Sequence, residues 1–180
     1  MQQAERQVVL DQLASSEVRL LELVDGLTPA QWHFRESAER WSIAENIEHV
    51  IAFEHFLTGV IVNVLQQPAQ PEKQSQAAAK EPLVFNIANG RDTRFNAREV
   101  VRPTGRWPDT AEMLAELRRT RAQTIAFVTG LDADLRSHFF AHVALGDLDC
   151  YQWLVVMAQH GARHAAQIEQ IKADPGYPAA

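Results

Sequence analysis

Four stretches of the chain place hydrophobic residues three and four positions apart over about twenty residues each, which is the spacing of an amphipathic helix. No stretch has the alternation typical of a strand, and we expect the short apolar run Leu83-Val84-Phe85 to pack against the helices. The sequence therefore predicts an all-α fold, a four-helix bundle. Its long helices are expected over residues 3–25, from Ser42 to a limit at Pro68, from Asp109 or Thr110 to Gly130, and from near Asp149 to Asp174.

Residues that begin or end helices stand at these boundaries. Ser42 with Glu45, and Asp149 with Gln152, have the spacing of a capping box, in which two side chains satisfy the first free N–H groups of a helix. Gly26 can end the first helix because it adopts a positive φ without steric cost. A short helical turn is predicted at Thr28-Pro29-Ala30-Gln31, because the Thr hydroxyl can cap it, Pro suits the first helical position and Gln can reach back to the cap.

The segment between the second and third long helices, residues 67–108, far exceeds the roughly two to eight residues that usually join helices. Such a long crossover can run back along the bundle, so these two helices can lie parallel. The segment has a net charge of +3, against −9 for the rest of the chain. We expect it to be held to acidic helices by weak surface ion pairs. The alternatives are a lid whose arginines receive an anionic substrate, and an anion-binding module that uses Arg91, Arg94 and Arg98.

The composition narrows the class of protein. With 180 residues, 46% of them apolar, we expect a single domain over residues 1–180. Apolar runs break before the roughly 18 residues of a membrane span, and the N-terminus lacks a secretory pattern, so we expect neither membrane insertion nor export. The single Cys150 favours a reducing, cytoplasmic setting, and the net charge of −6 disfavours nucleic acid as a partner.

Two of the seven histidines have the spacing of metal ligands. His160 and His164 stand four residues apart on the fourth helix, so both imidazoles lie on one face and can reach one ion. If the second and fourth helices are antiparallel, His49 lies within about 4.5 Å of the depth of His164 and can be the third ligand. His55 lies about 240° around the helix from His49 and is expected to contact solvent or the connector. His33 is expected at the surface or in a capping role.

His138 and His142 have the same four-residue spacing and form a rival pair. They fall between Asp134 and Gly146 in a short, irregular segment, where a fixed common face is less expected. Any such pair also has a structural interpretation, because histidine is often half-buried with a satisfied hydrogen bond.

Several side chains near the candidate ligands could assist a metal centre, each with a structural alternative. Asn46 and Gln167 could orient an imidazole or a bound group, or could simply bridge helices. Glu45 is better explained by its cap than as a base, so we name no catalytic base. Cys150, at a helix start, could have a lowered pKa or could simply pack. The aromatic residues that could line a pocket or fill the core are Trp41, Trp107 and Trp153.

Two segments carry a family resemblance: Trp41-Ser42-Ile43-Ala44-Glu45-Asn46-Ile47-Glu48-His49-Val50 and His160-Gly161-Ala162-Arg163-His164-Ala165-Ala166-Gln167-Ile168. They resemble the DinB-like superfamily of metal-binding four-helix bundles, and the likeness extends through Pro103-Thr104-Gly105-Arg106-Trp107 and the stretch from His142 to Trp153. The resemblance implies an up-down-down-up bundle and a divalent metal held by His49, His160 and His164. It also implies that His142 lies in a loop and is no ligand.

The same resemblance implies an activity class. Related bundles include thiol S-transferases, a thiol-dependent isomerase and hydrolase-like proteins, so we expect a metal-dependent transferase or hydrolase that acts on a small molecule. The metal could be zinc, nickel or iron, and a low-molecular-weight thiol could take part. Three neutral imidazoles would leave the charge of the metal undiminished and leave coordination positions open. The alternative is a non-catalytic metal-binding or structural stress protein, which could form a homodimer through an apolar helix face.

Overall fold

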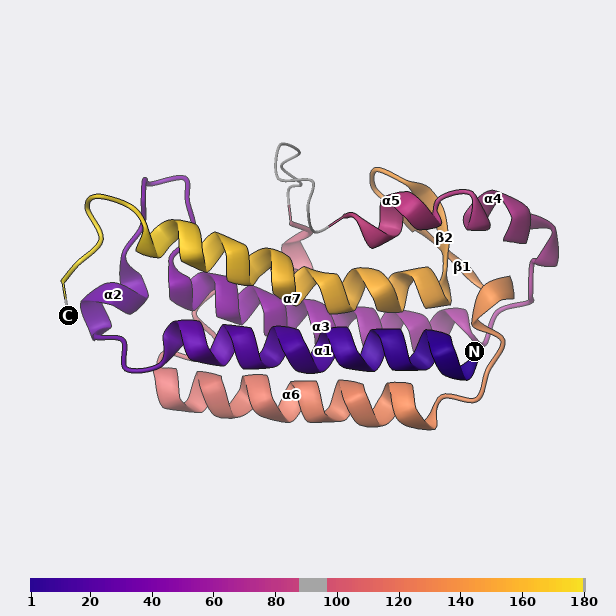
Figure 1. Cartoon of the computed structure of the whole chain (residues 1–180), viewed down its shortest axis with the longest axis horizontal. Helices are drawn as coiled ribbons and strands as arrows, with labels where there is room; N and C mark the ends of the chain where they lie inside the picture. Colours follow the sequence, from indigo (N-terminus) through magenta and orange to yellow (C-terminus); the bar gives the residue numbers. More distant parts are fainter. Residues whose placement is uncertain (88–96, 180) are drawn as a thin grey trace.

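The computed structural model describes residues 1–87 and 97–179, and four long helices make up most of this part (Figure 1). A short helix, α2, covers Pro29–His33 at the predicted helical turn. The predicted four-helix bundle is therefore confirmed, with a small β-hairpin added to it. The long helices are α1 Gln3–Val24, α3 Ile43–Val64, α6 Thr110–Gly130 and α7 Cys150–Lys172.

The predicted capping boxes form at the starts of α3 and α7. The Ser42 N–H donates to the Glu45 carboxylate over 2.8 Å, and the Ser42 hydroxyl accepts from the Glu45 N–H over 3.3 Å. Asp149 and Gln152 make the equivalent pair at α7. Gly26 follows α1 with a φ of 66°, a conformation that glycine adopts at no steric cost. Local sequence therefore accounts for where these helices begin and end.

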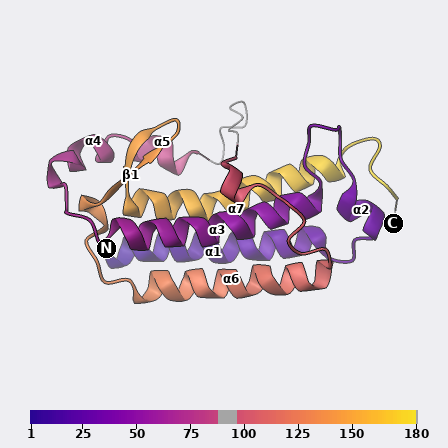
Figure 2. The ribbon, with the colours of Figure 1, turned by 180° about the vertical axis from the view of Figure 1, so that it is seen from behind.

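The helices run in two directions, with α1 and α7 one way and α3 and α6 the other (Figure 1). Contacts along the helices agree, since Arg19 of α1 bonds to Glu169 near the end of α7, and Arg6 bonds to the carbonyl of Leu131 just after α6. The crossover therefore returns the chain to the end of the bundle where α3 begins. Figure 2 shows its last part passing over α3 on the way to α6.

Apolar side chains fill the bundle in two clusters separated by a polar layer. Leu13, Leu57 and Leu154 belong to one cluster, and Leu20, Ile47 and Ile168 to the other. Stacking along the bundle buries the apolar face of every long helix, which is the main favourable term in folding. The polar layer consists of the side chains of Ser16, Glu54, Arg121 and Thr124, and Gly161 lies beside it.

The polar layer is built around the fully buried guanidinium of Arg121. It donates to the Glu54 carboxylate, the Ser16 hydroxyl and the Leu13 carbonyl. A Cβ at position 161 would lie 3.0 Å from the Ser16 hydroxyl oxygen and 3.3 Å from Arg121 Nη2. Gly161 therefore lets α7 approach α1 closely at the residue next to His160.

The crossover contains four short helical pieces in its described part: η1 Pro71–Lys73, α4 Gln74–Ala78, α5 Glu81–Phe85 and η2 Glu99–Val101. The run Leu83-Val84-Phe85 belongs to α5, and Val84 is fully buried against the bundle, as expected. Arg91 and Arg94 lie outside the described residues. The expected surface ion pairs with acidic helices are only partly right, because Arg106 reaches Glu48 of α3, whose carboxylate is buried.

A β-hairpin that the sequence did not predict precedes α7. Strands β1 Phe139–His142 and β2 Gly146–Asp149 pair antiparallel, with Phe139 opposite Asp149. Each strand has only four residues, and buried and exposed positions do not alternate along either of them, so the usual strand signal is absent. Tertiary contacts hold the hairpin instead, since the indole of Trp153 donates to the Phe140 carbonyl over 2.8 Å. The 3-10 helix η3, Leu135–Ser137, leads into it.

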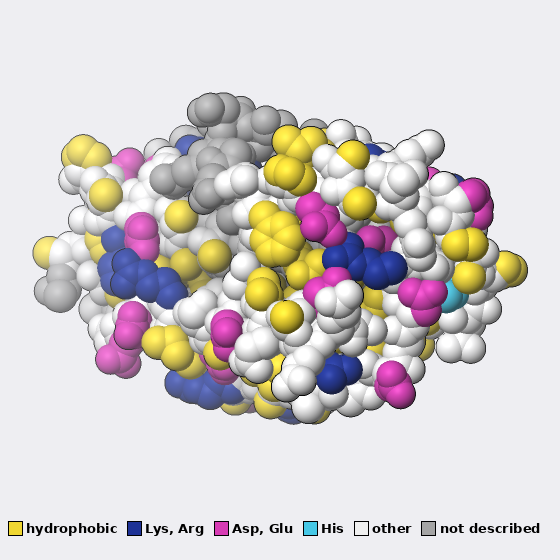
Figure 3. Space-filling model, turned by 45° about the vertical axis from the view of Figure 1, so that its right-hand side comes forward, with side chains coloured by type: hydrophobic (Ala, Val, Ile, Leu, Met, Phe, Trp, Pro, Cys, Tyr) yellow, Lys and Arg dark blue, Asp and Glu magenta, His cyan; other side chains and the backbone are white. Residues whose placement is uncertain are grey.

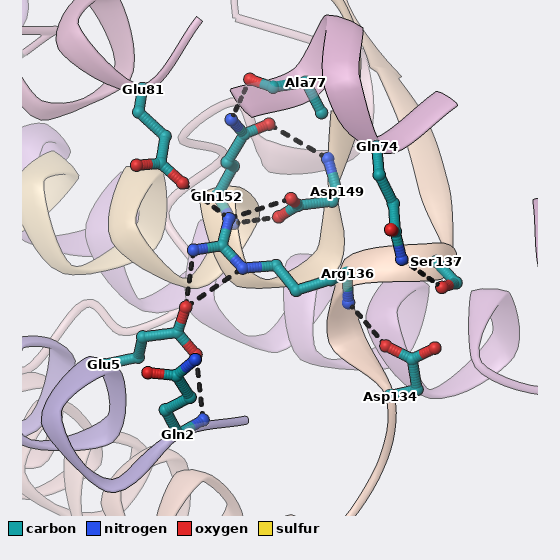
Figure 4. A network of polar contacts seen from close by, with 10 residues as sticks. All are labelled: Gln2, Glu5, Gln74, Ala77, Glu81, Asp134, Arg136, Ser137, Asp149 and Gln152. Carbon is teal, nitrogen blue, oxygen red and sulfur yellow. Dashed lines mark hydrogen bonds and ion pairs between the residues drawn. The ribbon is translucent and has the colours of Figure 1, made fainter. Parts of the chain in front are cut away.

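Arg136 of η3 ties the hairpin end of the bundle together (Figure 4). Its guanidinium contacts three carboxylates, those of Glu5, Glu81 and Asp149, which belong to α1, α5 and the cap of α7. The guanidinium also lies over the ring of Tyr151, 4.2 Å from the centroid. Although burial acts to lower it, the hydrogen bonds that Arg136 donates to Glu5 and Asp149 raise the pKa of its guanidinium. We call this group the Arg136 hub.

By length and composition, α3 could cross a membrane: its most apolar window has a mean hydropathy of 1.3, and 44% of that window is buried in the structure. The core helix of a globular domain meets the same criteria, so a single such helix is weak evidence for a span. Asn46, Glu48 and Glu54 of α3 also bond to neighbouring segments of the protein. Those contacts are the ones expected of a core helix.

Candidate metal centre

His49 of α3 meets His160 and His164 of α7 inside the bundle. One ring nitrogen from each lies within 4.8 Å of the others, and the ring centroids are 4.4 to 4.9 Å apart. His49 and His164 are 5% and 4% exposed, and His160 is half-buried. The three histidines selected by spacing and depth therefore meet at one point.

Two of these imidazoles are held by their Nδ1 atoms. His49 Nδ1 lies 2.7 Å from the Val101 carbonyl oxygen, and His164 Nδ1 lies 2.7 Å from Oδ1 of Asn46. The orientation of the Asn46 amide follows from its other end, where Nδ2 donates to the Ser42 carbonyl over 2.8 Å. Neither acceptor has a proton to give, so each Nδ1 carries the hydrogen and each Nε2 keeps its lone pair.

His160 completes the cluster one turn before His164. Its Nε2 lies 3.2 Å from Nε2 of His164, and its Nδ1 is buried without a hydrogen-bond partner. Its ring stacks on Phe53, with centroids 3.9 Å apart and planes 17° from parallel. Ring nitrogens that converge from three imidazoles suit a divalent cation, because imidazole nitrogen is a common ligand of zinc, nickel and iron. The residues present therefore fit such an ion.

All three imidazoles favour the neutral state. Burial lowers the pKa of His49, and the charge of Arg106 lowers it further, while the bond to Val101 opposes both. Burial also holds the pKa values of His160 and His164 well below their usual range, and the neighbouring imidazoles add to the effect. Neutral imidazoles are the form that binds a metal ion.

The cluster forms part of the wall of a cleft of about 730 Å³. That volume falls within the roughly 300 to 1,000 Å³ of small-molecule sites. The ring of Trp41 lies over His164, 20° from parallel. The guanidinium of Arg98 lies over the rings of Phe56 and Phe140, 5.8 and 5.3 Å from their centroids. The wall therefore combines aromatic surface with positive charge.

Some of the residues predicted to assist a metal centre lie beside the cluster or the cleft, and the others have structural roles. Asn46 orients His164, and the side-chain hydrogen bond between His164 and Gln167 raises the pKa of His164 against the effect of burial. Glu45 caps α3 and pairs with Arg35, so its structural interpretation holds. Of the three tryptophans, Trp41 and Trp153 line the cleft, and Trp107 packs against the core cluster that contains Leu20 and Ile47.

The other histidines lie apart from the cluster. His55 is exposed to solvent, which is one of the two expected alternatives, and it contacts α6 rather than the connector, with Nε2 2.8 Å from the Thr120 hydroxyl. His33 is exposed at the end of α2. His138 places its two ring nitrogens against two backbone carbonyls. His142 ends β1 instead of lying in a loop, and its Nδ1 accepts two backbone N–H groups of the hairpin turn. The rival pair does not form, because His138 precedes β1 and has both ring nitrogens against backbone carbonyls, while Nδ1 of His142 is held by the hairpin turn.

Two further outcomes concern residues beside the cluster. The possibility that Cys150 has a lowered pKa is wrong, because burial raises the pKa of its thiol to about 12. Sequence reasoning also missed the Val101 carbonyl and the Glu48 carboxylate, which hold the crossover beside His49. The one signal for Glu48 was a charged residue on the apolar face of α3. The Val101 carbonyl has no side-chain signal at all.

Three histidines that converge between two helices at the wall of a cleft are the kind of site in which helical bundles can hold a metal ion. Residues 12–168 match the DinB superfamily, and the chain belongs to it. The uncharacterized protein YuaE of Bacillus subtilis (strain 168) is 25% identical over 151 residues, which are 82% of this chain and 86% of YuaE.

Among solved structures, YfiT from Bacillus subtilis is similar with a TM-score of 0.62, over 99% of this chain and 91% of its own. It is described as "a probable metal-dependent hydrolase with an unusual four-helix bundle topology". The sequence identity is 13%, so the likeness is one of fold.

Proposed function

We propose that this protein is a metal-dependent enzyme of the hydrolase or thiol S-transferase type, and that His49, His160 and His164 hold its divalent metal. The observation that carries the proposal is the convergence of the three imidazoles at the wall of the cleft. When bound, the metal would supply Lewis-acid activation of a water or a thiol near neutral pH. The description of YfiT supports the hydrolase reading. We also propose the up-down-down-up arrangement for this chain, and the helix directions in Figure 1 support it.

The protein's own residues prepare the site for a small molecule. The Val101 carbonyl and the Asn46 amide fix the tautomers of two ligands, so little ordering is required when a metal binds. Phe53 covers one face of His160 and keeps water from it. Arg98 presents positive charge along the cleft. Three protein ligands would leave coordination positions open to a substrate.

Elemental analysis of tag-free protein tests the metal site. We expect about one equivalent of zinc, nickel or iron per chain in the wild type, and none in the triple variant His49→Ala, His160→Ala, His164→Ala. The control is His55→Ala. It removes a histidine that lies on α3, as His49 does, but outside the cluster, so this variant should keep the metal. Negligible metal in the wild type, even after incubation with each ion, would overturn the proposal in favour of a structural bundle.

Activity assays then test the enzyme. Loaded wild-type protein should hydrolyse ester or amide probes, or transfer a low-molecular-weight thiol, and the triple variant should not. Stoichiometric metal without turnover in either assay would point to a metal-binding protein that is not an enzyme.

We further propose a cytoplasmic protein whose partner is a small molecule and not nucleic acid. On the face in Figure 3, Lys and Arg side chains lie beside Asp and Glu side chains and form no continuous basic patch. A phosphate backbone needs such a patch for binding. A homodimer stays a prediction, which light scattering on purified protein checks.

A further inference from the structure

Glu48, the residue before His49, holds the end of the crossover against α3. Its side chain is buried and accepts the backbone N–H groups of Thr104 and Gly105 over 2.7 and 2.9 Å. It also accepts Nη1 of Arg106 over 2.8 Å. Gly105 has a φ of 76°, which lets the chain turn so that successive amides face one carboxylate. We call this arrangement the Glu48 clamp.

Arg106 extends the Glu48 clamp to the backbone around Val101. Nη1 of Arg106 also donates to the Arg102 carbonyl over 2.9 Å, and Nη2 donates to the Val100 carbonyl over 3.3 Å. These two carbonyls flank Val101, whose own carbonyl accepts from Nδ1 of His49. These hydrogen bonds therefore link Glu48 to His49, the next residue of α3, through the backbone of the crossover.

We propose that Glu48 is a positioning residue of the metal centre, which fixes the tautomer and ring orientation of His49 through the crossover. A backbone carbonyl on the second nitrogen of a metal-binding histidine sets which nitrogen faces the ion. Docking of residues 99–106 and metal binding at Nε2 of His49 favour the same imidazole tautomer, so each strengthens the other. The part of this proposal that concerns the metal rests on the proposed function.

A matched carboxylate elsewhere separates positioning from simple structural support. Asp149 and Glu48 are each 2% exposed, and Asp149 likewise accepts a backbone N–H and an arginine, those of Gln152 and Arg136. No histidine of the cluster is bonded to this group in the described part of the chain. Loss of either carboxylate should destabilise the fold, but only loss of Glu48 should act on His49.

The first measurement compares Glu48→Ala, Glu48→Gln and Asp149→Asn for binding of Co²⁺ and Zn²⁺. We expect Glu48→Ala to weaken binding by about 10- to 100-fold and to shift the visible spectrum of bound Co²⁺. Glu48→Gln keeps an acceptor oxygen and should restore part of the affinity. Asp149→Asn should bind as the wild type does. Equal affinity in Glu48→Ala and the wild type, or an equal loss in Asp149→Asn, would overturn the proposal.

The second measurement needs no metal. In metal-free protein with ¹⁵N-labelled histidine, we expect His49 to be the Nδ1–H tautomer in the wild type and in Asp149→Asn, and a mixture of tautomers in Glu48→Ala. An unchanged tautomer in Glu48→Ala would contradict the proposal. If the wild type binds no metal, the proposed function fails while this experiment still decides the role of Glu48. Where metal does bind, it should slow hydrogen exchange at the Thr104 and Gly105 amides of the wild type, and unchanged exchange there would contradict the linkage.

Discussion

The Arg136 hub and the histidine cluster are both polar groups within the fold, and they differ in how far their hydrogen-bonding atoms are satisfied. In the hub, all three guanidinium nitrogens of Arg136 face carboxylates, and two of those carboxylates also accept backbone amides. In the cluster, the lone pairs of His49 and His164 converge, and Nδ1 of His160 has no partner.

The difference separates structure from binding. A polar network whose charges are paired stabilises one arrangement of the chain, whereas buried imidazole lone pairs that converge suit a bound cation. We therefore assign the hub to holding the hairpin, α1 and α7 together, and the cluster to binding. Each prediction below changes one of the two regions and leaves the other as its reference.

The largest effect is expected from breaking the hub. Arg136→Met leaves the buried Asp149 carboxylate without its guanidinium partner, and we expect the free energy of unfolding to fall by about 3 kcal/mol. Urea denaturation measures it. The exposed Arg118→Met on α6 is the control and should change stability little. If metal affinity fell in Arg136→Met while the fold persisted, the separation of the two regions would be wrong.

The next effect comes from filling the cluster. A ligand that binds only the folded protein stabilises it by about 2.7 kcal/mol at a free concentration of 100 times Kd. For a domain of this size, that should raise Tm by roughly 5 to 10 °C. Thermal unfolding of the wild type with and without Zn²⁺ measures the shift. The triple histidine variant should show none, whereas Asp149→Asn, altered at the hub, should keep the whole shift.

A smaller effect is expected from pH in the metal-free protein. The pKa of His160 is lower in the folded protein than in the unfolded chain. The folded state is therefore favoured while the pH is above the pKa that His160 has in the unfolded chain, and this stability is lost as the pH falls below that value. Between pH 7.5 and 5.5, His160→Gln should therefore lose about 1 kcal/mol less stability than the wild type. Urea denaturation at both values in the presence of a chelator checks this. The exposed His33→Gln should follow the wild type, and parallel curves for all three proteins would contradict the expectation.

The two regions also differ in how much of each could be predicted from the sequence. The helix boundaries follow from local chemistry at Ser42 and Asp149, and the meeting of the histidines follows from helical geometry. Both kinds of prediction need only the residues of one helix, or the relative position of two helices. The cluster was therefore visible before the structure, although its role as a ligand set stays a proposal.

The hub and the Glu48 clamp were not visible, because their partners lie far apart in the chain. Arg136 bonds to Glu5, 131 residues away, and His49 bonds to the carbonyl of Val101, 52 residues away. A backbone carbonyl has the same chemistry at every position, so no residue type indicates it. The hairpin was missed for a related reason, since its four-residue strands depend on contacts with Trp153.

The smallest effect is expected at Cys150, where local and tertiary signals disagree within the hub end of the molecule. A helix start favours a thiolate, but burial and the neighbouring Asp149 charge raise the pKa of this thiol to about 12. At pH 8 the thiol is therefore protonated and covered, and a disulfide reagent should leave the native protein unmodified. Unfolding in urea should expose one reactive thiol per chain.

Arg136→Met loosens the hub and should make the thiol react at a measurable rate without urea, whereas metal loading at the distant cluster should leave that rate unchanged. Rapid reaction of the native wild type would mean that this end of the bundle opens readily. The assignment of the Arg136 hub to holding the hairpin, α1 and α7 together would then be wrong.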